Sequence, residues 1–362
     1  MKNQSPINNH QSTIIKVLIV DDSLTTREYM RYLFNADKDF KVVGMAKDGE
    51  EAVKMVQLKQ PDVVTMDIHM PGMDGYEATR RIMETNPVPI VVVSASLNSK
   101  EVAKTFQAIE AGAVTAQEKP PGPGNPQTDR MISKMLRTVK LMSEVKVVKR
   151  FAKLSKATAV PEILPRAEIR PAVSQVEMVT MGASTGGPPV IQTILSNLAD
   201  GFSYPILIVQ HIATGFLEGM VDWLSKSSAL PLKIPAHGES ILGGYVYFAP
   251  DNSHMGITGT GKIVLSKSPP ENGLRPAVSC LFRSAAKAFG QRAVGVLLTG
   301  MGKDGSSELK IMKEKGAITI AQDKKSSIVH GMPGEAIKLN AANHILSPEE
   351  IAVFLNSLDN RR

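Results

Sequence analysis

The 362-residue chain has a single cysteine, Cys280, and only 5% aromatic residues, among them one tryptophan. One cysteine cannot form an internal disulfide, which suits a protein of the reducing cytoplasm. The sequence also lacks any apolar run near the ~18 residues needed to span a bilayer. Residues 1–13 are polar, without the apolar segment of a signal peptide. We therefore expect a cytoplasmic protein with a disordered tail over residues 1–13 and no membrane insertion.

The net charge and the placement of basic residues bear on whether the chain binds nucleic acid. The formal net charge is +7, and much of the excess lies in residues 134–156, where lysine and arginine recur without interleaved aromatic residues. A solvated linker helix explains this run better than a nucleic-acid-binding arm. Residues 176–362 show no helix-turn-helix with a basic recognition helix. We expect no nucleic-acid partner, and the length favours two or three domains.

The most informative stretch is the glycine-rich turn GASTGG at residues 182–187, which follows an apolar, β-branched run. Pro188 then opens a helical pattern, so Ser184 should stand on a sharp strand-to-helix bend beside free amide N–H groups. The spacing G-x-S-x-G is that of a nucleophile elbow. The stretch lacks the full P-loop and dinucleotide-binding motifs, which disfavours phosphate binding. A glycine-rich turn with an incidental serine stays open as an alternative.

Short apolar runs alternate with amphipathic segments from residue 14 onwards. The expected strands are residues 17–20, 42–46, 63–66, 90–93 and 113–116, and the expected helices lie near 24–34, 49–58, 76–83 and 100–110. Such strand–helix repeats predict a parallel, doubly wound sheet, which binds ligands at the carboxyl ends of its strands.

Polar residues stand at the ends of these strands, namely Asp21, Asp22, Asp67, Ser94 and Lys119. Three carboxylates that converge on one crevice repel one another and need a cation, and open oxygen ligation suits Mg²⁺. A metal-bound, exposed carboxylate can also accept a phosphoryl group. A role as a turn or cap residue would explain any one of these aspartates, but not polar residues at so many strand ends.

Residues 14–150 resemble the receiver domain of bacterial two-component response regulators. The motifs are Asp21-Asp22, MDIHMPGMDG around Asp67, VVVSAS around Ser94, and QEKP around Lys119. The resemblance implies a flavodoxin-like fold, Asp67 as the phosphoacceptor and a histidine kinase as the phosphodonor.

The same resemblance assigns Mg²⁺ to Asp22, Asp67 and the main-chain carbonyl of His69, with Asp21 in the same acidic cluster. It assigns contacts with the phosphoryl group to Ser94 and Lys119.

A proline- and glycine-rich segment, PPGPGNPQ, ends this domain. Thr128 or Asp129 can then cap a helix that runs to about Lys149. The expected division is a tail over 1–13, a receiver domain over 14–127, a terminal receiver helix and linker over 128–175, and a catalytic domain over 176–362.

The second domain also alternates strands and helices. Besides the run before Ser184, strands are expected at residues 204–209, 245–248, 293–298 and 317–321, with a hairpin of 255–258 and 262–265. Ser347-Pro348-Glu349-Glu350 forms a capping box for a final helix. The fold class is therefore α/β, with a flavodoxin-like domain followed by a larger Rossmann-like domain. The second domain should have a mostly parallel sheet, an antiparallel hairpin and helices on both faces.

Two further residues can join Ser184. His211 comes directly after a buried strand, so it shares a sheet edge with Ser184 if their strands are parallel neighbours. His254, a few residues past its strand, is the second choice. Asp304 follows another buried strand, and its simpler explanation is a cap on the next helix. A Ser–His–Asp triad is defined by the roles of its residues rather than by their order.

The second domain resembles the bacterial chemotaxis protein-glutamate methylesterases. The residues that carry this resemblance are MGASTGGP at 181–188, QHI at 210–212, APDNSHM at 249–255, LRPAVSCLFRSAA at 274–286, TGMGKDG at 299–305 and AQDKKSSIVHGMPGEAI at 321–337. The resemblance implies Ser184 as nucleophile, His211 as general base, Asp304 as the residue that orients the histidine, and the Met301 N–H as an oxyanion donor. It implies no cofactor for the esterase.

The expected function is phosphorylation-regulated hydrolysis of glutamate γ-methyl esters on methylated chemoreceptors, and the resemblance adds deamidation of receptor glutamines. The alternatives are a related hydrolase in another signalling array, a non-catalytic partner-binding output domain, and a DNA-binding regulator. One departure from the family is Ser279, where methylesterases commonly have an aspartate in the motif Arg-Pro-Ser-Val-Asp. This change bears on substrate contacts near Arg275.

Overall fold

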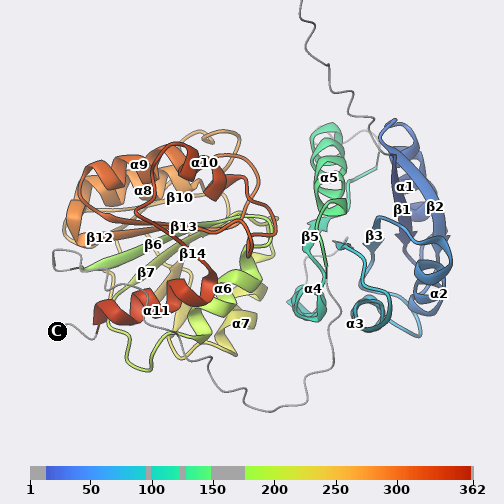
Figure 1. Ribbon diagram of the computed structural model, residues 1–362, viewed down its shortest axis with the longest axis horizontal. Coiled ribbons are helices and arrows are strands. Elements are labelled where there is room, and N and C mark those ends of the chain that lie inside the picture. The colour runs from blue at the N-terminus through green and yellow to red at the C-terminus, as the bar shows by residue number, and fades with distance from the viewer. Residues whose placement is uncertain (1–13, 95–98, 123–127, 148–175, 360–362) are drawn as a thin grey trace, which may run out of the picture. The chain divides into compact units, whose positions relative to one another are not determined.

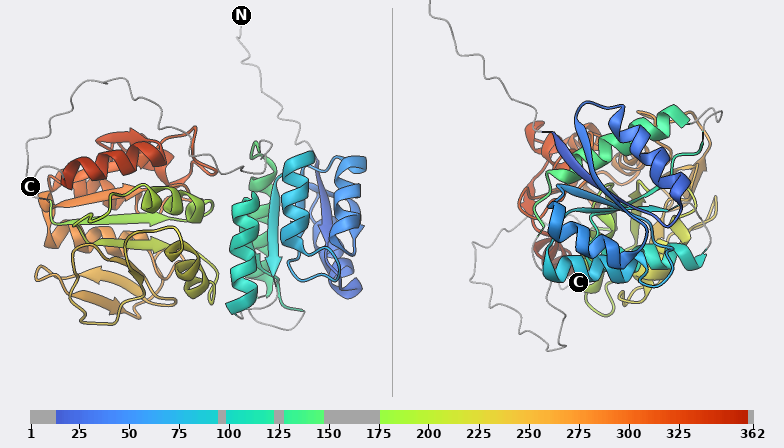
Figure 2. Two further views of the ribbon diagram at one scale, coloured as in Figure 1. Left: turned by 90° about the horizontal axis from the view of Figure 1, so that it is seen from below. Right: turned by 90° about the vertical axis from the view of Figure 1, so that its right-hand side faces the viewer.

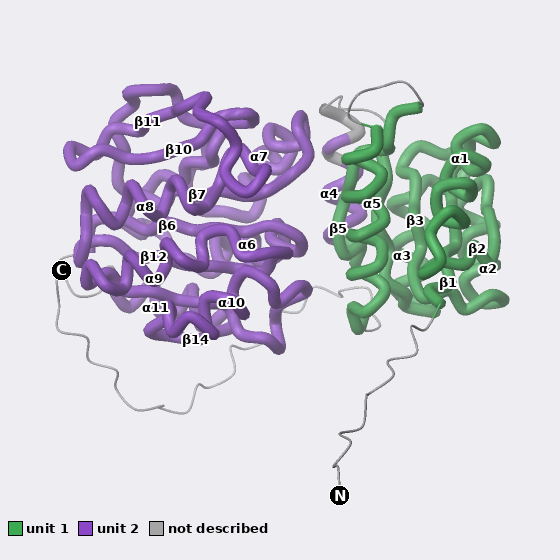
Figure 3. The backbone as a smooth tube through the Cα atoms, turned by 90° about the horizontal axis from the view of Figure 1, so that it is seen from above, with its two compact units in different colours: residues 1–95, 111–151 green, residues 96–110, 152–362 purple. Residues whose placement is uncertain are grey.

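The computed structural model describes residues 14–94, 99–122, 128–147 and 176–359. The chain forms two compact units, one of residues 1–95 and 111–151 and the other of residues 96–110 and 152–362 (Figure 3). The expected tail over 1–13 and most of the expected linker lie outside the described residues. No helix among the described residues has the length and apolar character required to cross a bilayer.

The first unit is built on one five-stranded parallel sheet in the order β2-β1-β3-β4-β5. The strands are β1 Ile15–Val20, β2 Phe40–Ala46, β3 Val63–Met66, β4 Ile90–Ser94 and β5 Thr115–Glu118. The helices in this stretch of chain are α1 Leu24–Asn35, α2 Gly49–Lys59, α3 Gly75–Thr85, α4 Ser99–Ala111 and α5 Thr128–Ser143. This strand order is the flavodoxin-like one, as predicted. The strands and helices of this unit can be followed by their colours in Figure 2.

Several element boundaries in this region differ from the expected ones, most clearly those of β5 and α5. The strand expected at 113–116 is β5, which begins at Thr115 and ends at Glu118. Its polar Gln117 and Glu118 pair with Val93 and Ser94 of β4, so an apolar pattern could not reveal this strand end. The helix expected to reach Lys149 ends at Ser143, whose hydroxyl donates to the Lys140 carbonyl oxygen, a local bond that competes with further helix.

The second unit contains a seven-stranded sheet in the order β14-β13-β12-β6-β7-β9-β8, and every neighbouring pair is parallel. The strands are β6 Met178–Ala183, β7 Ile206–Gln210, β8 Leu232–Lys233, β9 Val246–Phe248, β12 Ala293–Leu297, β13 Ile318–Gln322 and β14 His344–Leu346. The predicted hairpin forms a separate antiparallel pair, β10 His254–Ile257 with β11 Ile263–Ser266.

Helices cover both faces of this sheet (Figure 1). They are α6 Gly187–Ser196, α7 Leu217–Ser225, α8 Val278–Ala288, α9 Ser306–Glu314, α10 Met332–Lys338 and α11 Pro348–Asp359, with a short 3₁₀ turn at Gly290–Arg292. The predicted capping box at α11 is confirmed, because Ser347 N donates to Glu350 Oε2 and Glu350 N to Ser347 Oγ, at 2.9 and 3.3 Å.

The central strand of the seven is β6. The chain adds β7 on one side of it and returns later to add β12 on the other, so the strand order reverses beside β6. Loops diverge from the carboxyl ends of the strands at such a switch point, which makes it the usual ligand crevice of an open α/β sheet. The fold therefore predicts that a ligand site is formed by the residues that follow β6, β7 and β12.

Candidate active site

Ser184, His211 and Thr299 continue three neighbouring strands at one edge of the sheet. Ala183 of β6 pairs with Gln210 of β7, and the His211 N–H donates to the Ala183 carbonyl oxygen at 2.9 Å. On the other side, the Ser184 N–H donates to the Thr299 carbonyl oxygen at 3.0 Å. The expectation that the strands before Ser184 and His211 are parallel neighbours is confirmed.

The turn that carries Ser184 is tightly packed. Gly186, which precedes α6, has φ of 77°, a left-handed conformation that favours glycine. A Cβ atom on Gly300 would lie 2.7 Å from the Cβ of Ser184, so the loop after β12 can approach the serine only with glycine there. Among the described residues, the hydrogen bonds of Ser184 involve its main chain alone. Its hydroxyl is therefore not committed to a structural bond.

His211 faces Asp304. The ring Nε2 lies 2.9 Å from Asp304 Oδ2, and the two side chains are 9% and 2% exposed. This separation is short enough for a hydrogen bond, but Nε2 has no partner that meets the angular criteria, so the contact is a close approach. An ionised carboxylate at this distance favours the tautomer with the proton on Nε2. The lone pair is then on Nδ1.

The carboxylate of Asp304 rests on the start of α8. Oδ2 accepts from Val278 N at 2.6 Å, and Oδ1 accepts from Ser279 N at 3.1 Å and from Ser279 Oγ at 2.6 Å. The alternative that Asp304 caps the helix after it is wrong, because the residue before α9 is Gly305 and α9 has no side-chain cap. The helix start that Asp304 caps is that of α8, some 25 residues earlier in the chain.

This environment keeps Asp304 ionised. Burial by itself would raise the pKa of Asp304, but the close approach of His211, then the bonds from Ser279 and Val278, outweigh burial and lower the pKa from its ordinary value of 3.8. The positive end of the α8 macrodipole acts in the same direction.

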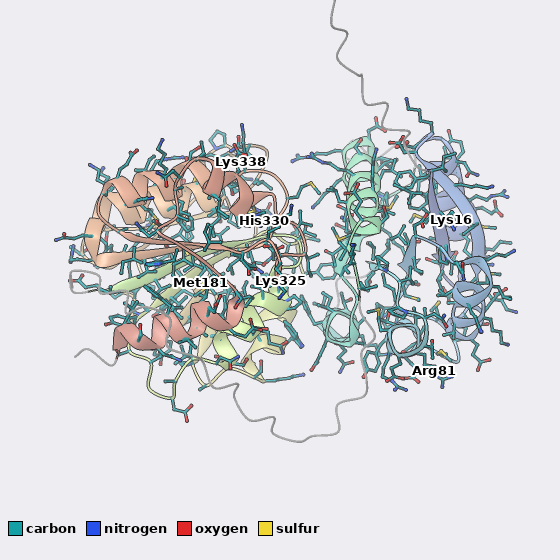
Figure 4. The ribbon with its side chains drawn as sticks, in the orientation of Figure 1. Lys16, Arg81, Met181, Lys325, His330 and Lys338 are labelled. Carbon is teal, nitrogen blue, oxygen red and sulfur yellow. The ribbon has the colours of Figure 1, made fainter. Side chains whose placement is uncertain are left out.

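The loop after β12 contains Met301. Its main-chain N–H makes no hydrogen bond among the residues that the structure describes. Both main-chain polar groups of the preceding Gly300 are hydrogen-bonded. Its N–H donates to the Val329 carbonyl oxygen, and its carbonyl oxygen accepts from Gly331 N and Met332 N. His330, labelled in Figure 4, lies between Val329 and Gly331, two of the residues that bond to Gly300. Lys325, also labelled, precedes Val329 by four residues.

Sequence reasoning missed two supporting residues. Gln210 Nε2 donates to the carbonyl oxygens of Ser184 and His211, at 2.8 and 2.9 Å, and so links the two chain segments. The Thr299 hydroxyl lies 3.0 Å from the Thr185 carbonyl oxygen and accepts from Val329 N. Their positions directly beside a strand-end histidine and before the TGMG glycines were the available signals.

His254, the second choice of histidine, is placed elsewhere. It begins β10 and is 3% exposed. Its Nε2 lies 3.1 Å from the Pro269 carbonyl oxygen, and its Nδ1 accepts from Ala277 N at 3.3 Å. Both ring nitrogens therefore have structural partners, and His211 is the histidine that approaches Asp304.

The acidic cluster of the first unit also forms at strand ends. Asp21, Asp22 and Asp67 each offer one carboxylate oxygen, and these oxygens lie within 4.8 Å of one another. Lys119 Nζ lies 2.7 Å from Asp21 Oδ2 and 3.1 Å from Asp67 Oδ2. Ser94 is 2% exposed, and its carbonyl oxygen accepts the Lys119 N–H at 2.9 Å.

The charges in this cluster are strongly coupled. Burial raises the pKa of Asp67, and Lys119 only partly opposes that rise. Burial alone would lower the pKa of Lys119, but Asp67 and Asp21 reverse the effect and raise it. The set of hard, closely spaced carboxylate oxygens fits a divalent cation such as Mg²⁺, which would relieve the repulsion among them. His69 is exposed two residues beyond Asp67.

These two sites define a class of protein, a response regulator whose output domain is a hydrolase. The family model described as CheB methylesterase matches residues 179–355, and the response regulator receiver domain matches residues 17–125. The chain belongs to the protein-glutamate methylesterase/protein-glutamine glutaminase family. It is an ester hydrolase, and an output domain that only binds a partner is not favoured.

Two relatives illustrate this membership. The chain is 54% identical to protein-glutamate methylesterase/protein-glutamine glutaminase 4 of Geobacter metallireducens, over 95% of this chain and 99% of that protein. It is 52% identical to the corresponding protein 1 of Syntrophus aciditrophicus, over 95% and 98%. Among solved structures, the CheB methylesterase catalytic domain of Thermotoga maritima matches 51% of this chain and 100% of its own, with 37% identity and a TM-score of 0.49.

Proposed function

We propose that this enzyme hydrolyses the γ-methyl esters of glutamates on methylated chemoreceptors in the cytoplasm, under the control of phosphorylation at Asp67. The observation that carries the catalytic part is the convergence of Ser184, His211 and Asp304 at the switch point of one parallel sheet. Deamidation of receptor glutamines would use the same site, because amides and esters pass through a similar tetrahedral intermediate. The names of the relatives support both activities.

The geometry suggests how protons move. Ser184 Oγ attacks the ester carbonyl carbon while Nδ1 of His211 takes the hydroxyl proton, because Nε2 faces Asp304. The oxyanion that forms accepts from main-chain N–H groups at the Ser184 turn and from Met301, each contributing a few kcal/mol to transition-state stabilisation. The tetrahedral intermediate then expels methanol, which receives the proton from His211. Water, activated by the same ring, hydrolyses the acyl-enzyme and returns Ser184.

The receiver chemistry would take place at the acidic cluster. Asp67 is the proposed phosphoacceptor, and Ser94 and Lys119 are proposed to contact the phosphoryl oxygens, which the 3.1 Å separation of Lys119 Nζ from Asp67 Oδ2 supports. Asp22, Asp67 and the His69 carbonyl would hold Mg²⁺, beside Asp21 in the same cluster. When bound, the ion would neutralise charge on the entering phosphoryl group.

Release of methanol tests the esterase function directly. The purified full chain, incubated with receptor membranes bearing radiolabelled methyl esters, is expected to release labelled methanol. Unmethylated membranes and Ser184→Ala protein are the controls. Label that stays on the receptor with active, folded protein would exclude this substrate.

Phosphorylation at Asp67 is tested by a ratio of rates. In the wild type, a small phosphodonor with Mg²⁺ should increase the rate of methanol release, because an aspartyl phosphate adds charge and strong acceptors beside Lys119. In Asp67→Asn the ratio with and without donor should be one. Asp62→Asn, which removes a carboxylate of the same unit outside the cluster, should keep the wild-type ratio. An Asp67→Asn protein that still responds would contradict the assignment.

The sign of control is tested with a fragment. If the receiver inhibits the enzyme and phosphorylation relieves this inhibition, residues 176–362 alone should turn over faster than the unphosphorylated full chain. A fragment that is no faster would favour positive activation by the receiver instead.

A further inference from the structure

Polar side chains lie on the side of Asp304 that faces away from His211. Oδ2 points to His211, while Oδ1 accepts from the hydroxyl of Ser279 at 2.6 Å. Ser279 is 3% exposed and lies in the first turn of α8. The hydroxyl also accepts from Gly305 N at 3.1 Å, so it bridges the start of α8 and the residue after Asp304.

A second carboxylate lies on the far side of this hydroxyl. Ser279 Oγ is 2.7 Å from Oε2 of Glu308, whose side chain is 15% exposed. Arg283 Nη2 lies 3.3 Å from Oε1 of the same carboxylate, and Arg283 is itself held by Glu271 at 2.8 Å. Arg283 therefore holds Glu308 at Oε1. Because the Ser279 hydroxyl carries one proton, it donates either to Asp304 or to Glu308 at a given moment and not to both.

We propose that Ser279 is a positioning residue for Asp304, and that Glu308, which lies within hydrogen-bond reach of the same hydroxyl, influences this role. The inference rests on the proposed roles of Asp304 and His211. From the resemblance to the family, a serine at position 279 was expected to affect substrate contacts near Arg275. The Ser279 hydroxyl instead contacts Asp304 and Glu308, so we expect the effect at Asp304.

The physical reason is the freedom of a carboxylate to rotate about its terminal torsion, which is broad for aspartate. The main-chain N–H groups of Val278 and Ser279 each donate to one carboxylate oxygen of Asp304. The Ser279 hydroxyl adds a charge-assisted bond at Oδ1. With Oδ1 held, Oδ2 stays directed at His211. A third carboxylate at position 279, with Glu308 present, would instead face two negative charges at close range.

The first experiment removes the hydroxyl from the full-length protein. Ser279→Ala should lower kcat for methyl ester hydrolysis by roughly tenfold or more, the usual effect of one hydrogen bond to a charged group. KM should change little, because the hydroxyl touches Asp304 rather than substrate. Ser284→Ala is the matched control, since it removes a hydroxyl of the same helix whose partners, among the described residues, are main-chain atoms of Ile257 and Leu281. An unchanged kcat in folded Ser279→Ala protein would overturn the proposal.

The second experiment tests the pairing with Glu308. Ser279→Asp should be less active than Ser279→Ala, and adding Glu308→Gln should restore activity relative to Ser279→Asp alone, because it removes one of three crowded charges. A loss caused only by altered packing would not be reversed by Glu308→Gln, and that result would contradict the proposal. Thermal unfolding of each variant identifies the folded fraction.

Asp304→Asn, assayed in parallel, separates the two levels of inference. If Asp304→Asn stays fully active, the proposed role of Asp304 fails. If it loses activity while both Ser279 variants keep theirs, only the role of Ser279 fails.

Discussion

Replacing Ser184 with alanine should reduce ester hydrolysis by at least about 10⁴-fold, leaving the background supplied by oxyanion stabilisation and substrate binding. The reason is that Ser184 Oγ is the only nucleophile proposed for the strand-end crevice. Its hydroxyl makes no hydrogen bond among the described residues, so its removal should not change the free energy of unfolding appreciably.

Rates of methanol release and thermal unfolding, measured on the same preparations, test this expectation. Ser196→Ala is a suitable control, because it removes an exposed hydroxyl from the last residue of α6, the helix that begins just after Ser184. His211→Ala should cause a similar loss of activity, and the double variant should be little worse than either single one, because members of a triad act as a unit. Near-normal turnover in Ser184→Ala would exclude the serine as nucleophile.

Much of this site could be predicted because parallel strands end at a common edge. Ser184 and His211 each follow a buried apolar run, and the register of β6 and β7 brings the two residues side by side. The same argument gathered Asp21, Asp67 and Lys119 in the first unit. Apolar runs locate strands, and strand ends locate polar side chains, so these sites follow from patterns within short windows.

The contacts of Asp304 could not be predicted in this way. Its partners at the start of α8 come from a segment 25 and 26 residues earlier in the chain, after the β10–β11 hairpin. No local pattern connects Ser279 to Asp304, and the local pattern around Asp304 favoured a cap on the next helix. The site residues that follow strand ends were therefore accessible from sequence, whereas the residues that hold them in place required the tertiary structure.

Asp304→Asn is expected to lower turnover by roughly 10²–10⁴-fold and to cost about 1–3 kcal/mol of stability. Each carboxylate oxygen of Asp304 accepts from a main-chain N–H, but an asparagine has one acceptor oxygen only. If the amide nitrogen takes the place of Oδ2, it opposes Val278 N–H and can donate to His211 Nε2, which stabilises the wrong tautomer. If it takes the place of Oδ1, it opposes Ser279 N–H instead, and the bond to Ser279 is disturbed.

The kcat per folded molecule, measured beside the pH dependence of unfolding, distinguishes this role from simple capping. The folded-state pKa of Asp304 is lowered, so its contribution to stability is fully present above its ordinary pKa of 3.8 and is lost as pH falls through the lower folded value. Asp304→Asn should therefore destabilise the protein most at neutral pH, and the difference from wild type should shrink in acid. A residue that only caps α8 would show this stability difference while kcat per folded molecule stayed normal. A parallel loss of kcat at neutral pH, where the variant is still folded, assigns Asp304 to His211 as well as to the helix.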